Sequence, residues 1–287
     1  MIRGFLTLLL CALMSPVVAQ IPTKIYAQEL VDRTAAAYPD LLVIAMHVTP
    51  PNAGQNVIIA SNIGRIGKIA DEDDLRVIET GRPNVEMAHG GQRFEVELPL
   101  RDVTGVTVGA LGLVWTYRGE DRATFESKAQ HIRDDLAKRI LNSANLMDPY
   151  PFDPRATTRT RAQKLVDAAV VRHPELTVLA VRAQSPSAGT LIVLGSTFGR
   201  HGKKADADDL AIFDKGNVVT GIYSYGRRFG IDLPLLDRTG RKIGTMNVGY
   251  SWSAGADEKA LLAKAIALRD ELGSSIASAE DLEELDP

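Results

Sequence analysis

The sequence has few of the residues that build disulfide scaffolds or metal centres. Its 287 residues include one cysteine, which excludes a disulfide framework and a cysteine-built metal site. Five histidines are present, and no two of them form a tight ligand pair. They are His47, His89, His131, His173 and His201. We therefore expect no metal and no cofactor.

An excess of charge of one sign is also absent. Lysine and arginine number 33 against 36 acidic residues, and the formal net charge is −3. The basic residues are scattered along the chain, which disfavours a nucleic-acid partner. Hydrophobic residues make up 45% of the chain, enough for a sizeable core, so a largely disordered protein is excluded. After the N-terminal segment, no apolar run approaches the roughly 20 residues that a membrane span needs.

The N-terminal segment 1–19 has the pattern of a secretory signal peptide. Arg3 supplies the positive start, 5–14 is apolar, and Val17-Val18-Ala19 places small residues before a cut at Gln20. The alternative is an uncleaved membrane anchor, for which the apolar run is too short. We expect cleavage near Ala19/Gln20 and a mature protein that is periplasmic or secreted, with no membrane span.

The rest of the chain is an internal duplication. A shift of about 135 residues superposes the sequence on itself, with about a third of the aligned positions identical. Because this period is far longer than that of solenoid repeats, each copy should be a whole domain. The best-matched segments are 27–32 with 162–167, 64–75 with 199–210, and 93–100 with 228–235.

Composition shifts set the expected domain boundaries. The segment 148–154 contains three prolines, which prevent a continuous helix and predict a stiff linker. We expect, after the signal peptide at 1–19, a first domain at 20–145, a proline-containing linker at 146–159, a second domain at 160–280 and an acidic tail at 281–287.

Hydrophobic periodicity predicts the same elements in each copy. A helix at 24–38 ends before a proline and is followed by apolar strands at 41–48 and 57–60. Asp71 is the expected N-cap of a short helix. Apolar and charged residues then alternate over 93–100, before a Gly-containing hairpin turn and a further strand. Because hairpins dominate, the fold class should be α+β, with two antiparallel sheets flanked by helices. The aromatic residues at the strand ends, Trp115 and Tyr250 among them, are expected in the core rather than in a pocket.

Two motifs carry a family resemblance. They are the Gly-Arg-x-Gly-Lys-x-Ala-Asp segment at 64–71 and 199–206 and the Leu-Pro-Leu-x-Asp-x-x-Gly-x-x-x-Gly hairpin at 98–109. With the element order, they resemble PAS-like extracytoplasmic sensor domains of the Cache type, here in tandem. The resemblance implies small-molecule binding in a pocket on the sheet. The usual Cache receptor has flanking membrane helices and a cytoplasmic output, and neither is found in this sequence.

The clearest candidate site residues are cations before the short helix of each copy. They are Arg65 and Lys68 before Asp71, repeated as Arg200 and Lys203 before Asp206. One interpretation is an anion site at the helix N-terminus. The other is a glycine-shaped loop whose cations pair with the capping carboxylates. A calcium loop is excluded, because the positions that need Gly and Glu hold other residues.

Further candidates lie on the strands. Arg93 and Arg228 begin strands that are otherwise apolar, where arginine suits a carboxylate ligand but also an exposed cross-strand ion pair. Ser61 and Ser196 end the second strand and orient a ligand or cap a turn. Asn247 gives the second copy a polar strand face where the first copy has Gly112.

These observations favour an exported, non-catalytic binding or sensory protein whose small-molecule ligand is anionic. A membrane protein of the cell envelope is the expected partner. The alternative is a protein–protein interaction scaffold of the envelope, and the least favoured hypothesis is an enzyme with an unrecognised site. No Ser/His/Asp signature, phosphate loop or pair of catalytic carboxylates is found.

Overall fold

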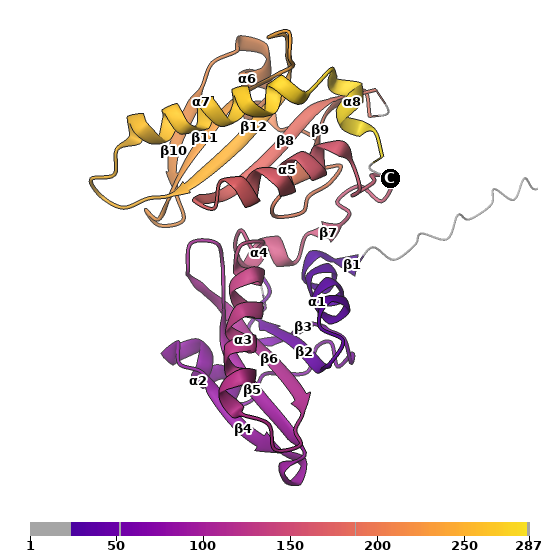
Figure 1. The fold of residues 1–287 in the computed structure, drawn as a ribbon, viewed down its shortest axis with the longest axis vertical. Helices are drawn as coiled ribbons and strands as arrows, with labels where there is room; N and C mark the ends of the chain where they lie inside the picture. The colour runs from indigo at the N-terminus through magenta and orange to yellow at the C-terminus, as the bar shows by residue number, and fades with distance from the viewer. Residues whose placement is uncertain (1–23, 52, 187, 286–287) are drawn as a thin grey trace, which may run out of the picture.

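The computed structural model describes residues 24–285 except 52 and 187. The predicted signal peptide, its cleavage site and Cys11 lie outside the described residues. The chain forms two lobes, one above the other in Figure 1. Lobe 1 comprises residues 24–150 and lobe 2 residues 160–285, and the linking segment 151–159 joins them. Among the described residues, no helix is long and apolar enough to cross a membrane.

The two lobes repeat the same order of helices and strands. Lobe 1 contains β1 (Lys24–Ile25), α1 (Tyr26–Ala37), β2 (Leu41–Val48), β3 (Val57–Ser61), α2 (Glu72–Thr80), β4 (Asn84–Ala88), the short 3₁₀ helix η1 (His89–Gly91), β5 (Arg93–Arg101), β6 (Thr107–Thr116), α3 (Arg122–Ala137), α4 (Ser143–Leu146) and β7 (Pro149–Tyr150). Lobe 2 contains α5 (Arg161–Arg172), β8 (Leu176–Ser185), β9 (Thr190–Ser196), α6 (Ala207–Lys215), β10 (Val219–Tyr223), β11 (Arg228–Leu236), β12 (Lys242–Ser251), α7 (Glu258–Ser275) and α8 (Ala279–Glu283).

Each lobe is built on a five-stranded sheet. The strand orders are β3-β2-β6-β5-β4 and β9-β8-β12-β11-β10, and every neighbouring pair is antiparallel. The predicted α+β class with two antiparallel sheets flanked by helices is therefore confirmed. The predicted N-caps are confirmed as well, because Asp71 and Asp206 each form a capping box at the start of α2 and α6.

Alternation along the strands gives each sheet a core face and a second face. In lobe 1 the core face packs against α1 and α3, where Trp115 meets Phe125 with 5.7 Å between ring centroids. In lobe 2 the corresponding helices are α5 and α7. Of the four aromatic residues predicted in the core, Trp115 and Tyr250 are 1% and 3% exposed, which confirms their place, whereas Tyr117 and Trp252 are half-buried and pack against the edges of the two cores. The second face of each sheet lies beneath the short helix, α2 or α6.

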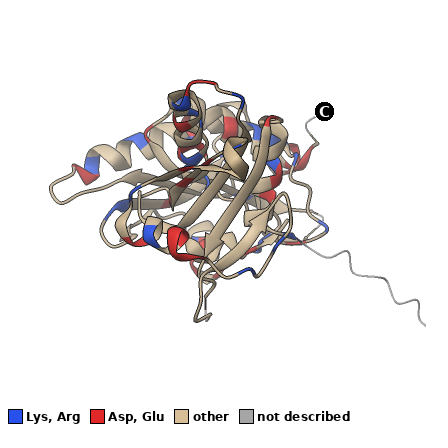
Figure 2. Cartoon of the chain, turned by 90° about the horizontal axis from the view of Figure 1, so that it is seen from below, with Lys and Arg blue, Asp and Glu red and all other residues tan. Residues whose placement is uncertain are grey.

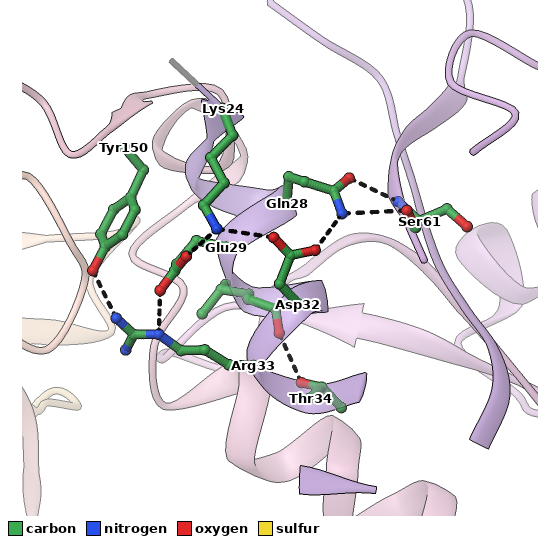
Figure 3. Close-up of polar contacts among 9 residues, drawn as sticks. Lys24, Gln28, Glu29, Asp32, Arg33, Thr34, Ser61 and Tyr150 are labelled. Carbon is green, nitrogen blue, oxygen red and sulfur yellow. Dashed lines mark hydrogen bonds and ion pairs between the residues drawn. The ribbon is translucent and has the colours of Figure 1, made fainter. Parts of the chain in front are cut away.

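Each lobe is closed where the chain enters and leaves it. In lobe 1, β1 pairs with β7, and the Tyr26 N–H donates to the Asp148 carbonyl at 2.8 Å. Figure 3 shows the same closure in side chains, where Arg33 of α1 reaches the hydroxyl of Tyr150 at 2.6 Å. In lobe 2, the Arg161 N–H donates to the Glu284 carbonyl at 2.9 Å.

The acidic tail predicted at 281–287 is not a separate tail in its described part. Asp281 and Leu282 belong to α8, and Leu282 is fully buried in the core of lobe 2. The prediction rested on composition, but α8 repeats α4 of lobe 1 and closes the second lobe in the same way.

Lobe 1 also contacts lobe 2 directly. Val103 and Leu141 of lobe 1 pack against Val178, Ala180 and Phe198 of lobe 2. The linking segment lies on the loop after β9, where the Asp153 N–H donates to the His201 carbonyl at 3.2 Å.

Candidate ligand cavity in lobe 2

A large cavity lies on the second sheet face of lobe 2. Its volume is about 590 Å³, and it is bounded by β8, β11, β12, α6 and the loop after β9. Volumes of this size are typical of small-molecule sites. The charged and amide lining residues are Arg182, Arg200, Asp206, Asp208, Asp209, Lys215, Asn217, Arg228, Asp232 and Asn247.

Arg228 is a cation of this cavity for which no acceptor is found among the described residues. It begins β11, and its guanidinium lies over the Tyr223 ring, 5.4 Å from the centroid. Its Nη1 is buried without a hydrogen-bond partner among the described residues. Burial lowers the pKa of Arg228 from its usual value. A buried guanidinium nitrogen without an acceptor favours a bound anion, which would supply that acceptor.

A second arginine faces the same space. The Nε of Arg182 on β8 lies 3.0 Å from a carboxylate oxygen of Asp209 on α6, and both side chains are largely buried. The Nη1 of Arg182 is also buried without a partner among the described residues. Arg182 therefore has one nitrogen committed to Asp209 and another available to a ligand.

An acidic group balances the two arginines. The Asn247 amide donates to the Asp232 carboxylate at 2.5 Å, across the β11–β12 pair. Burial raises the pKa of Asp232, and the donor from Asn247 opposes that rise. The cavity thus offers donors from arginine beside an acceptor from aspartate, an arrangement suited to an anionic ligand with its own hydrogen-bond donor.

The equivalent region of lobe 1 is smaller and acidic. Its cavity measures about 90 Å³, and His47 and Glu97 stand at the positions that correspond to Arg182 and Asp232. His47 Nδ1 lies 2.9 Å from an Asp74 carboxylate oxygen. Ligand atoms of Asp71, Asp74 and Glu97 lie within 4.8 Å of one another. The first two carboxylates already form the capping box of α2, which explains their proximity without a metal.

Three of the predicted lobe 2 site residues line the large cavity. These are Arg200, Arg228 and Asn247. The Nε of Arg200 also contacts the Asp148 carboxylate of lobe 1 at 2.7 Å.

The other two lobe 2 candidates have structural contacts instead. Ser196 Oγ accepts a hydrogen bond from the Phe198 N–H at 3.0 Å. Lys203 lies over the Phe152 ring, 5.8 Å from the centroid. Neither residue lines the 590 Å³ cavity.

The candidates in lobe 1 are not joined in one site. Ser61, Arg65 and Lys68 border the small cavity, whereas Arg93 does not. Ser61 Oγ accepts from the Ile63 N–H at 3.2 Å, and Lys68 pairs with Asp71 at 3.5 Å. Arg93 contacts the His89 ring at 3.0 Å. These contacts fit the structural interpretation of the lobe 1 residues.

Sequence reasoning missed Arg182, Asp209 and Asp232 as a group around the cavity. A signal that could have found Arg182 is the difference between the copies, since it corresponds to His47. The cavity combines residues kept in both copies, such as Arg228, with residues that differ between them, such as Arg182.

Comparisons with known proteins identify remote structural likenesses. No protein-family model matches the chain, and a search of curated proteins found no match. Among solved structures, the chain is similar to the inducer-binding domain of the PobR transcription factor from Acinetobacter, in complex with 3-hydroxybenzoic acid. The TM-score is 0.29 at 10% identity, over 39% of this chain and 93% of that one.

Two further structures are similar at the same level. The nlh2 GAF domain from A. aeolicus has a TM-score of 0.29 at 13% identity, over 38% of this chain and 78% of that one. PelD from Pseudomonas aeruginosa has a TM-score of 0.28 at 15% identity, over 89% and 79% of the two chains. TM-scores this low assign no function, and the predicted Cache type stays a prediction.

Proposed function

We propose that this chain is a non-catalytic binding or sensory protein that holds a small anionic molecule in the cavity of lobe 2. The observation that carries the proposal is the unpartnered guanidinium of Arg228, facing a cavity of about 590 Å³. Arg182 adds a second donor with no acceptor. Two arginine nitrogens without acceptors beside one cavity favour a ligand site over a scaffold that binds no small molecule.

The lining chemistry supports binding rather than catalysis. Among the described lining residues, none is a serine, cysteine or histidine. The carboxylates are used in capping and pairing, as Asp206 caps α6 and Asp209 pairs with Arg182. Interspersed acidic and basic residues over the lobes, visible in Figure 2, fit a small-molecule ligand better than a nucleic acid.

Export is part of the same proposal. The pattern of Arg3, the apolar stretch 5–14 and Ala19 supports removal of the first 19 residues and a periplasmic or secreted location. A ligand bound there would be presented to a membrane protein of the envelope. The intact mass of the protein recovered from the producing cell tests this step, with Gln20 as the expected first residue.

A thermal-shift panel tests the binding proposal. The probes are acetate, succinate, citrate, benzoate and inorganic phosphate, with benzamide and succinamide as uncharged controls of matched shape. A probe at 100 times its Kd stabilises the folded protein by about 2.7 kcal/mol, which raises Tm by several degrees. We expect at least one anion to raise Tm while its amide does not. Equal responses to anions and amides, or no response to any probe, would overturn the proposal.

A further inference from the structure

We propose that lobe 1 completes the ligand site of lobe 2, with Leu141 as a wall of the cavity, so that binding depends on how the two lobes dock. This inference rests on the proposed function. It adds a role for lobe 1, whose own cavity is about 90 Å³.

Leu141 belongs to lobe 1 but lines the cavity of lobe 2. It follows α3, and its side chain is half-buried. It packs with Val103 of the β5–β6 hairpin turn against Val178, Ala180 and Phe198. Since Phe198 also lines the cavity, this apolar contact is at once the lobe–lobe interface and one side of the site.

Polar contacts across the interface lead to the same cavity. The Asn145 amide of α4 donates to the Phe198 carbonyl at 3.1 Å, and to the Asp148 carboxylate at 3.0 Å. Asp148 in turn lies 2.7 Å from the Nε of Arg200, a cavity residue. Asp148 is therefore a positioning residue for Arg200, held in place by lobe 1.

A comparison of the two copies shows how docking of the lobes changes the surroundings of the loop arginine. Arg65 is the lobe 1 counterpart of Arg200, and both have left-handed backbones, with φ of 63° and 69°. Arg65 is exposed, whereas the Arg200 side chain is 23% exposed and paired with Asp148. The arginine of this loop is thus paired and largely covered in lobe 2, where lobe 1 lies against it, and exposed in lobe 1.

The charges of lobe 1 also act on Arg228. Asp102, in the hairpin turn beside Val103, favours the charged form of Arg228 and partly opposes the effect of burial on its pKa. A ligand on Arg228 therefore binds in surroundings that include lobe 1. By linkage, any probe that binds more tightly to the docked arrangement also stabilises it.

Charge substitutions at Leu141 test the inference. Leu141→Lys and Leu141→Glu perturb packing to a similar degree but place opposite charges in the wall of an anion site. The anion from the thermal-shift panel with the largest effect is titrated into each full-length variant by calorimetry at low salt. With the added charge about 10 Å from a singly charged anion and an effective dielectric constant between about 20 and 80, the lysine variant should bind roughly 4- to 270-fold more tightly than the glutamate variant.

Ala277 supplies the matched control. It occupies the same place after α7 that Leu141 occupies after α3, and it is exposed and does not line the cavity. Ala277→Lys and Ala277→Glu should bind the same anion equally. If the two Leu141 variants also bind equally, or if both lose affinity to the same extent, lobe 1 does not face the ligand and the inference is overturned. In that case wild-type binding still upholds the proposed function, whereas no binding by the wild type overturns both.

Discussion

Replacement of Arg228 by alanine removes the cation on which the proposed function depends most. The guanidinium lies over the Tyr223 ring, lines the cavity, and has no hydrogen-bonded carboxylate among the described residues. A hydrogen bond to a charged group contributes about 1.5–3 kcal/mol, so the variant should lose roughly 10- to 150-fold in affinity for an anion. Arg228→Lys keeps the charge but loses the planar pair of donors. Its affinity for the anion should therefore lie between those of the wild type and Arg228→Ala.

Arg93 is the matched control, because it holds the same position on β5 of lobe 1. It contacts His89 and does not line either cavity described above. Arg93→Ala should therefore leave affinity unchanged. The assay is calorimetric titration with the anion selected by the thermal-shift panel, after circular dichroism has shown that each variant is folded. Unchanged affinity in folded Arg228→Ala would refute the reasoning and assign that arginine to the structure of β11.

Three pH-dependent outcomes follow from buried titratable groups. Because burial raises the pKa of Asp232 above its usual value, its protonation should tighten binding of an anion whose own charge is constant as the pH is lowered, and Asp232→Asn should flatten this profile in calorimetry. Burial lowers the pKa of His201 to about 4, and Gln163 contacts its Nε2 at 2.8 Å. The fold favours the neutral form of His201, so its contribution to the free energy of unfolding should be complete above pH 6.5 and decrease toward pH 4. In urea unfolding, the His201→Gln variant should therefore lose less free energy of unfolding over that range. Burial, with the nearby Asp74 carboxylate, raises the pKa of Glu97 to about 7. The stability that this shift contributes is present below pH 4.5 and lost as pH rises through 7, so Glu97→Gln should raise Tm at pH 8 but not at pH 5.

Much of the fold could be predicted because each copy repeats strong local signals. The alternation at 93–100 gives β5, and the Asp71 cap is followed by α2, as expected. The role of α8 could not be predicted, because five residues carry little periodicity and the burial of Leu282 depends on contacts with distant strands.

The candidate site was harder to predict than the fold. Arg228 and Asn247 stood out as polar residues on otherwise apolar strands, and the structure places them around one cavity. Arg182 lies in an apolar run of β8 and gave no local sign of its pairing with Asp209 on α6. The contribution of Leu141 depends on the docking of two lobes, which neither periodicity nor capping chemistry encodes.

The closure of each lobe has a consequence for how such a chain arises. Because β1 lies beside β7, and Arg161 beside Glu284, the chain enters and leaves each lobe at neighbouring points. A gene segment for one lobe can therefore be copied in tandem without any strand having to thread through the existing sheet. Where the chain leaves the first lobe, residues 151–159 lie on the loop after β9 of the second lobe. Fusion alone thus brings the two units into contact, and later substitutions at positions such as 182 and 247 can give one unit a site while the other becomes its support.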